Sequence, residues 1–148
     1  MDDIAKAAGM SRPALYLIYK NKEDIYCDVL QSHATAGILA AEQAAKSSGS
    51  LQSRLMKMVE VGFLEFFGQV ANSEHGQELM DIKFTLGRSV KTEWRKGIVE
   101  SMAKAIGGDK GEVHANLIFD VIDGLKARTL DIDEIRSGIK TVIDLIAR

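Results

Sequence analysis

The apolar residues of this chain recur at intervals of three and four along almost its whole length. In the segment from 22 to 46, for example, Ile25, Val29, Leu30 and Ile38 follow this spacing. A period near 3.6 places such residues on one face of a helix, and no stretch keeps the period of two that indicates a strand. The sequence contains one proline, and clusters of glycine and serine separate the periodic segments. We therefore expect an all-α fold.

The composition restricts the class of protein further. The chain has 148 residues, 46% of them hydrophobic, which suits one core with a small appended subdomain. Its net charge of -2 supplies no overall basic field, so any nucleic-acid binding has to come from a local patch. The single cysteine, Cys27, excludes an intramolecular disulfide and a multi-cysteine metal site. With neither a signal-like start nor a membrane-length apolar run, the expected location is the cytoplasm.

The N-terminal residues have the order helix, tight turn, helix. DDIAKAA (2 to 8) reads as a short helix, Gly9 and Met10 as a turn, and Ser11 as the cap of a second helix from Arg12 to about Tyr19. This is the pattern of a helix-turn-helix. A recognition helix presents its N-terminal end to the major groove of DNA, so the sequence predicts a DNA-reading end around residue 12.

The side chains at that end have the chemistry to read DNA. Arg12 can form a bidentate contact to guanine, Pro13 and Ala14 offer apolar contact to a thymine methyl, and Tyr16 can donate to a phosphate. Lys22 lies at the start of the next helix, where exposed N–H groups also attract a phosphate. Lys20 and Asn21 lie beside it. Each residue alone is compatible with an ordinary solvated surface, but together they favour DNA binding.

The segment MDDIAKAAGMSRPALYLIYKNKEDIY (1 to 26) resembles the DNA-binding segment of the TetR/AcrR family of bacterial transcription regulators. The resemblance implies a partial DNA-binding domain at 1–24 and a helical effector-binding and dimerisation domain at 25–148. It implies that Ser11, Arg12, Pro13, Ala14 and Tyr16 line the operator side and that Lys22 touches the DNA backbone, with Lys20 nearby. The implied function is a regulator, expected to be a repressor, whose operator affinity is controlled by a small effector.

Two departures from the family pattern stand out. Leu17 and Ile18 are apolar where the family often has a polar or aromatic residue near a phosphate. The first helix of the family's DNA-binding domain would precede Met1, and we expect either a start assigned too late or a truncated gene product. Without that helix, the expected exposed residues are Ile4, Ala8, Leu15, Ile18 and Ile25. An alternative function follows, namely a dimeric small-molecule-binding protein that has lost DNA binding through truncation.

Two helical segments, 112–130 and 131–148, end the chain. Asp131 and Glu134 form a start like a capping box. Apolar stripes run along both segments at Leu117, Ile118, Val121, Ile122, Leu125, Ile132, Ile135, Ile139, Val142 and Ile146. Gly124 allows another helix to approach closely. Periodicity leaves packing within the chain and packing in a dimer equally open, whereas the family resemblance implies a homodimer through 112–148.

The middle of the chain is rich in methionine and aromatic residues. Ser50 can cap a helix there, and a further helical region spans 77 to 105, where Gly87 is a candidate break. By the resemblance, the helices of this region surround an apolar effector cavity, whose predicted lining is Met56, Phe63, Phe66, Phe67, Met80, Phe84 and Trp94. His33, Glu65, His75 and Arg88 are candidate polar partners. Each residue is individually more typical of an ordinary core.

Catalysis is not expected. His33, His75 and His114 lie far apart in sequence, and none has a second histidine or cysteine at the spacing of metal ligands. No glycine-rich phosphate loop or serine nucleophile motif is present. The sequence therefore predicts no cofactor, and it predicts DNA and a small molecule as partners.

Overall fold

The computed structural model describes residues 1–74 and 88–148, and in these ranges the regular structure is entirely helical. The first part contains α1 (Asp2–Ala7), α2 (Arg12–Ile18), α3 (Lys22–Ala45), α4 (Leu51–Val59), the π-helix η1 (Glu60–Leu64) and α5 (Glu65–Ala71). The second part contains α7 (Arg88–Ile106), α8 (Gly111–Arg128) and α9 (Ile132–Ile146). The all-α expectation is confirmed.

Side-chain caps fix where several helices begin. The Ser11 and Ser50 hydroxyls accept hydrogen bonds from the backbone N–H groups of Ala14 and Ser53, both at 3.2 Å. Such caps satisfy N–H groups that have no partner inside the helix. These starts agree with the sequence predictions.

The start of α9 is capped differently from the expected box. The Asp131 carboxylate accepts from the N–H groups of Asp133 and Glu134 at 2.9 and 3.1 Å. The N–H of Asp131 donates to Thr129 and not to Glu134. Only one half of the predicted capping box is therefore formed. The Thr129 hydroxyl accepts the hydrogen bond from the Asp131 N–H that the Glu134 carboxylate would accept in a complete box.

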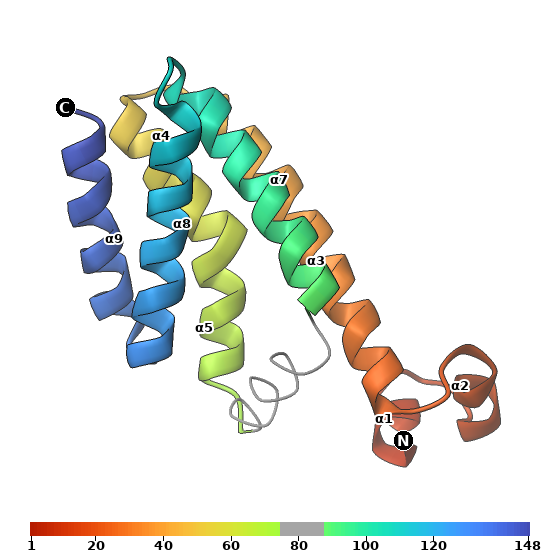
Figure 1. Ribbon diagram of the computed structural model, residues 1–148. Coiled ribbons are helices and arrows are strands. Elements are labelled where there is room, and N and C mark those ends of the chain that lie inside the picture. The colour runs from red at the N-terminus through yellow and green to blue at the C-terminus, as the bar shows by residue number, and fades with distance from the viewer. Residues whose placement is uncertain (75–87) are drawn as a thin grey trace.

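The helices form a bundle with an extension at one end. Helices α3 and α7 run side by side as a long diagonal pair, and α4, α5, α8 and α9 gather along one side of it (Figure 1). Helices α1 and α2 lie at the N-terminal end of α3, far from α4 and the C-terminus of α9 (Figure 1). Helix α3 is thus the continuous connection between the N-terminal pair and the bundle. The predicted domain boundary at residues 24 and 25 falls inside it.

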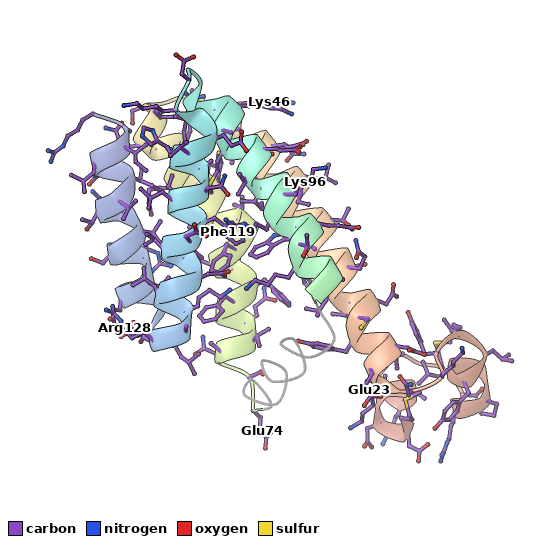
Figure 2. All side chains as sticks on the ribbon, in the orientation of Figure 1. Glu23, Lys46, Glu74, Lys96, Phe119 and Arg128 are labelled. Atoms are coloured by element: carbon purple, nitrogen blue, oxygen red, sulfur yellow. The ribbon has the colours of Figure 1, made fainter. Side chains whose placement is uncertain are left out.

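The core lies where α4, η1, α7, α8 and α9 meet. Phe119 occupies its centre, between α8 and α7 (Figure 2). The largest fully buried side chains of the described residues are Leu55, Met58, Val59, Leu64, Met102, Ile118, Phe119, Ile122, Ile135, Ile139 and Ile143. Burial of this apolar area is the main stabilising contribution to the bundle.

The stripe of α9 differs in one position from the sequence prediction. Ile135 and Ile139 are fully buried as expected, but the third fully buried residue is Ile143. Ile132, Val142 and Ile146 are partly buried against the core. Steps of four place Ile135, Ile139 and Ile143 on the line nearest α8 and α4, and Val142 falls to its side.

Glycines allow α3 to pack closely on its neighbours. A Cβ added to Gly37 of α3 would lie 3.1 Å from the carbonyl oxygen of Gly62 in η1. A Cβ added to Gly97 of α7 would lie 2.6 Å from the Cδ1 of Ile38, closer than packing permits. These contacts hold α3 against the two elements that carry the cavity described below.

Candidate functional site

The first candidate site is the surface formed by α1, α2 and the start of α3. Gly9 has a φ of 64°, in the left-handed region that favours glycine, and the N–H of Met10 donates to the Ala5 carbonyl at 2.9 Å. This turn packs α1 against α2, with Ala5 and Leu15 buried between them. Leu15 was expected to be exposed, and that expectation is wrong because α1 itself covers it. The predicted helix-turn-helix is confirmed as a local structure.

The N-terminal end of α2 faces solvent. Ser11, Arg12, Pro13 and Tyr16 are exposed, and Ala14 is half-buried. The Arg12 guanidinium forms an ion pair with Asp2 at 3.0 Å and lies 5.5 Å from the centre of the Tyr16 ring. Both partners of the ion pair are more than half exposed, so it contributes little to stability and exchanges readily for another acceptor.

The turn between α2 and α3 is held by polar contacts. Tyr19 ends α2 in an extended conformation, and its hydroxyl donates to the Asp28 carboxylate on α3. This hydrogen bond is the main reason that the pKa of Tyr19 lies above its ordinary value. The N–H of Lys20 donates to Asp24 at 3.0 Å, and the N–H of Asp24 donates to Asn21 at 2.8 Å. The orientation of α2 is thus coupled to the first two turns of α3.

Lys20 and Lys22 flank that turn, and both are exposed. Lys22 is the first residue of α3, whose N-terminal N–H groups carry the positive end of the helix dipole. The ammonium and the helix end therefore add their positive charge at the start of α3. The predicted DNA-contacting residues lie together on this N-terminal unit (Figure 1).

Apolar side chains are also exposed on α2. Leu17 is 89% exposed and Ile18 61% exposed, while Ile4 and Ile25 are half-buried and Ala8 is exposed. The exposure expected for Ile18 and Ala8 is therefore found, and that expected for Ile4 and Ile25 is found in part. This side of α2 has no cover among the described residues.

The second candidate site is a cavity of about 320 Å³ between α3, η1, α5, α7 and α8. Its volume lies at the lower end of the range of about 300–1,000 Å³ that small-molecule sites occupy. The π-helix contributes Val61, Gly62 and Phe63 to the wall. Such an irregular helical turn is frequent at functional sites. No periodicity in the sequence indicated it.

Four of the predicted ligand-binding residues line this cavity: Phe63, Phe66, Phe67 and Trp94. Met56 is not among the lining residues, because its side chain packs against the core. Met80 and Phe84 lie outside the described residues. Of the candidate polar partners, His33 and Glu65 line the cavity, His75 lies outside the described residues, and the side chain of Arg88 is not described.

The aromatic rings of the wall contact one another. The rings of Phe63 and Trp94 stack with their centres 5.3 Å apart, and Trp94 meets the buried Phe119 edge-on at 5.3 Å. The ring of His33 stacks on Phe66 at 4.2 Å. Stacked and edge-on pairs at these distances are favourable. These contacts orient the rings of the wall relative to one another.

A charged group that sequence reasoning missed lies on the same wall. The ammonium of Lys126 on α8 lies 4.2 Å from the centre of the Phe63 ring, and its side chain is 12% exposed. Asp123 forms ion pairs with Lys126 at 3.5 Å and with Lys91 of α7 at 2.8 Å. Burial alone would raise the pKa of Asp123, but the two ammonium groups outweigh it and lower the pKa below its usual range. The one signal in the sequence was the spacing of three between Asp123 and Lys126, which is common on solvated helices.

Helices α8 and α9 bury one face and expose another. Ile118 and Ile122 point into the core, whereas Val113, Leu117 and Leu145 are 66%, 48% and 59% exposed. Within the described residues, a Cβ added to Gly124 would meet nothing within 4 Å, so none of them makes the predicted close approach at Gly124. Close packing of α8 on α9 occurs at Gly138 instead, against Leu125.

The described residues show neither a metal-binding cluster nor a membrane-spanning helix. No group of three or more histidine, cysteine, aspartate or glutamate residues there is arranged to hold a metal ion. In residues 1–74 and 88–148, no helix has both the length and the apolar character needed to span a membrane.

Comparisons with known proteins point to the N-terminal unit. The family model of bacterial regulatory proteins, tetR family, matches residues 1–29. The chain is also 32% identical over 80 residues to the HTH-type transcriptional activator FasR of Mycolicibacterium smegmatis (strain ATCC 700084 / mc(2)155). That alignment covers 54% of this chain and 35% of FasR, so the chain matches about a third of its relative. No solved structure matches the chain significantly.

Proposed function

We propose that this chain, whose first 29 residues match the family model of bacterial regulatory proteins, tetR family, is a regulator of that family and binds operator DNA through α2. The observation that carries the proposal is the exposed N-terminal end of α2, with Arg12, Pro13 and Tyr16 directed to solvent on a helix-turn-helix. An arginine at this place suits guanine O6 and N7 in the major groove. Lys20 and Lys22 supply phosphate contacts beside it. DNA as the partner also implies action in the cytoplasm.

The proposed control is by a small apolar or aromatic effector in the cavity. The cavity lies against α3, the helix that continues to the DNA-reading unit, and Tyr19 and Asp24 couple α2 to the start of that helix. A ligand that binds better to one position of α3 shifts the population toward that position. If that state separates the reading units of a dimer, the ligand lowers operator affinity, so we propose repression. FasR is named an activator, so a reporter gene under the operator, assayed with and without the protein, tests the sign.

A homodimer through residues 112–148 is part of the proposal. Support comes from the exposed apolar residues Val113, Leu117 and Leu145 and from the open space at Gly124. Operators read by helix-turn-helix dimers need two reading units at a fixed spacing. Leu117→Glu should convert the dimer to a monomer in light scattering, whereas Leu39→Glu, a matched change at an exposed leucine of α3, should not. A wild-type protein that is monomeric would contradict this part.

The experiment that tests DNA binding is selection of duplexes from a random library, followed by gel shift at several salt concentrations. Affinity should fall steeply with salt, because phosphate contacts release counterions. Lys22→Ala should weaken binding to all sequences and reduce the salt slope by about 1. Lys104→Ala, an exposed lysine on α7, is the control and should change neither. No enrichment of any sequence would overturn the proposal.

A second candidate is a dimeric ligand-binding protein that does not bind DNA. It is favoured by the exposure of Leu17 and Ile18, which leaves one side of α2 without apolar cover among the described residues. The same selection separates the two candidates. Ligand binding without salt-dependent DNA binding would favour this second function.

A further inference from the structure

The cavity has a cationic corner on a mostly apolar wall. Lys91 of α7 and Lys126 of α8 both line it, and both pair with Asp123, which does not line it. Other polar lining groups are His33 of α3 and Glu65 and Gln69 of α5. Glu65 and His33 are exposed, where water screens charge, whereas the Lys126 side chain is 12% exposed.

The Lys126 ammonium is fixed in position before any ligand arrives. It lies over the Phe63 ring at 4.2 Å and within 5.9 Å of the Phe67 and Trp94 ring centres. A cation over aromatic faces is attracted by the ring quadrupoles, and the Asp123 carboxylate pairs with it at 3.5 Å. A positive group is therefore preorganised beside an aromatic surface, and preorganised groups bind with a smaller entropic cost.

We propose that the cavity binds a small aromatic monocarboxylate, with its ring against the Phe63, Phe66 and Trp94 wall and its carboxylate on Lys126. Lys91 provides a second, more exposed cation for the same carboxylate. A cationic ligand fits less well, because it would have to displace Lys126 from the rings while facing Lys91. The inference rests on the proposed function, since it names the chemical class of the effector.

The test uses aromatic ring systems of increasing size, each prepared with one of three head groups. Benzoate, 2-naphthoate and biphenyl-4-carboxylate are compared with their primary amides and with their aminomethyl analogues. Trp94 lines the cavity and is the sole tryptophan of the sequence, so its fluorescence reports binding at this site. For at least one ring system, the carboxylate should bind about 10- to 100-fold more tightly than the amide, as expected for a charge-assisted hydrogen bond.

Variants assign the effect to the cationic corner. Lys126→Met keeps an unbranched side chain over the rings. It should remove most of the preference for carboxylate over amide, with Lys91 left as the second cation, while amide affinity stays unchanged. Lys91→Gln, at a more exposed position, should reduce the preference by a smaller factor. The matched control is Lys96→Gln on the same helix, labelled in Figure 2, whose lysine is 78% exposed and lies outside the cavity lining. It should bind all the probes as the wild type does.

Several results would overturn the inference: an amide or amine that binds as tightly as its carboxylate, equal losses for carboxylate and amide in Lys126→Met, or no binding by any probe. If Lys126→Met does not fold, as judged by thermal unfolding, an unchanged head-group preference in Lys91→Gln would also overturn it.

Gel shift on the selected operator separates this inference from the proposed function. A carboxylate preference without an effect on DNA binding supports the inference and contradicts effector control. A neutral amide that controls DNA binding supports effector control and contradicts the inference.

Discussion

The N-terminal unit and the bundle differ in what holds their functional residues in place. In the N-terminal unit, Ala5 and Leu15 are the buried residues of α1 and α2, and Arg12, Tyr16 and Leu17 are exposed. In the bundle, the cavity wall rests on fully buried side chains such as Phe119 and Ile122. The comparison teaches that the N-terminal unit presents its proposed DNA-contacting groups as individual surface side chains, whereas the cavity depends on packing among several helices.

The largest predicted effect on stability comes from removing the buried aromatic side chain of Phe119. Phe119→Ala should lower the free energy of unfolding by about 3–5 kcal/mol, because it removes buried apolar area and leaves a cavity. Leu17→Ala, at an 89% exposed position, should change it by less than about 0.5 kcal/mol. Urea unfolding followed by circular dichroism measures both. Similar losses would mean that the two regions are not distinct in this way.

The next largest predicted effect is a loss of operator affinity without a loss of folding stability. Arg12→Ala should cost about 1–3 kcal/mol of operator binding and relax the base preference at one position, because a bidentate guanine contact is lost. Its ion pair with Asp2 is exposed, so the unfolding midpoint should stay within error. Gel shift on single-base operator variants, alongside thermal unfolding, gives both values. An Arg12→Ala protein with unchanged base preference would remove Arg12 from the reading surface.

Removal of single helix caps should give smaller effects on stability that still differ between the two regions. Asp131→Ala should lower the free energy of unfolding by about 1 kcal/mol, because the N–H groups of Asp133 and Glu134 lose their acceptor. Ser11→Ala removes one acceptor in the N-terminal unit and should act mainly on local opening there. Hydrogen exchange should show faster exchange confined to α2, with the global midpoint nearly unchanged. A full-sized global loss in Ser11→Ala would show that the N-terminal unit unfolds together with the bundle.

The smallest predicted effect is a pH dependence of bundle stability. The pKa of Asp123 is lower in the folded chain than its ordinary value of 3.8, so its ionised form stabilises the fold above that pH. This contribution should be lost as the pH falls through the folded pKa. Asp123→Asn should therefore be less stable than the wild type near pH 7, and the two should converge once the pH has fallen below the lowered pKa of Asp123. A stability difference that is constant with pH would show that the ion pairs with Lys91 and Lys126 contribute nothing.

The sequence predicted local features well. The caps at Ser11 and Ser50, the glycine turn at Gly9 and the long helix from residue 22 are all found within a residue or two. Each depends on interactions between residues at most a few positions apart, so a local pattern is enough to indicate it. Phe63, Phe66, Phe67 and Trp94, predicted to bind a ligand by the family resemblance, line the cavity, and ligand binding by them stays a prediction.

Features that depend on contacts distant in sequence were not predicted. Lys126 looked like an ordinary surface lysine, and only the approach of α8 to η1 and α7 places it over Phe63 beside Lys91. Met56 has the same apolar character as the lining residues, yet it faces the core. The π-turn at Glu60–Leu64 changes the helix register there, and the periodicity of the flanking residues does not reveal it.

The sequence by itself determined the helical class, the helix starts and the identity of the side chains at the N-terminal end of α2, because these follow from spacing and from each residue's own chemistry. The tertiary structure decided which apolar residues enclose a cavity, which face of α8 stays open at Gly124, and which lysine becomes a fixed cation. The physical reason is that burial and charge pairing depend on distances between helices, and those distances result from the packing of the whole bundle.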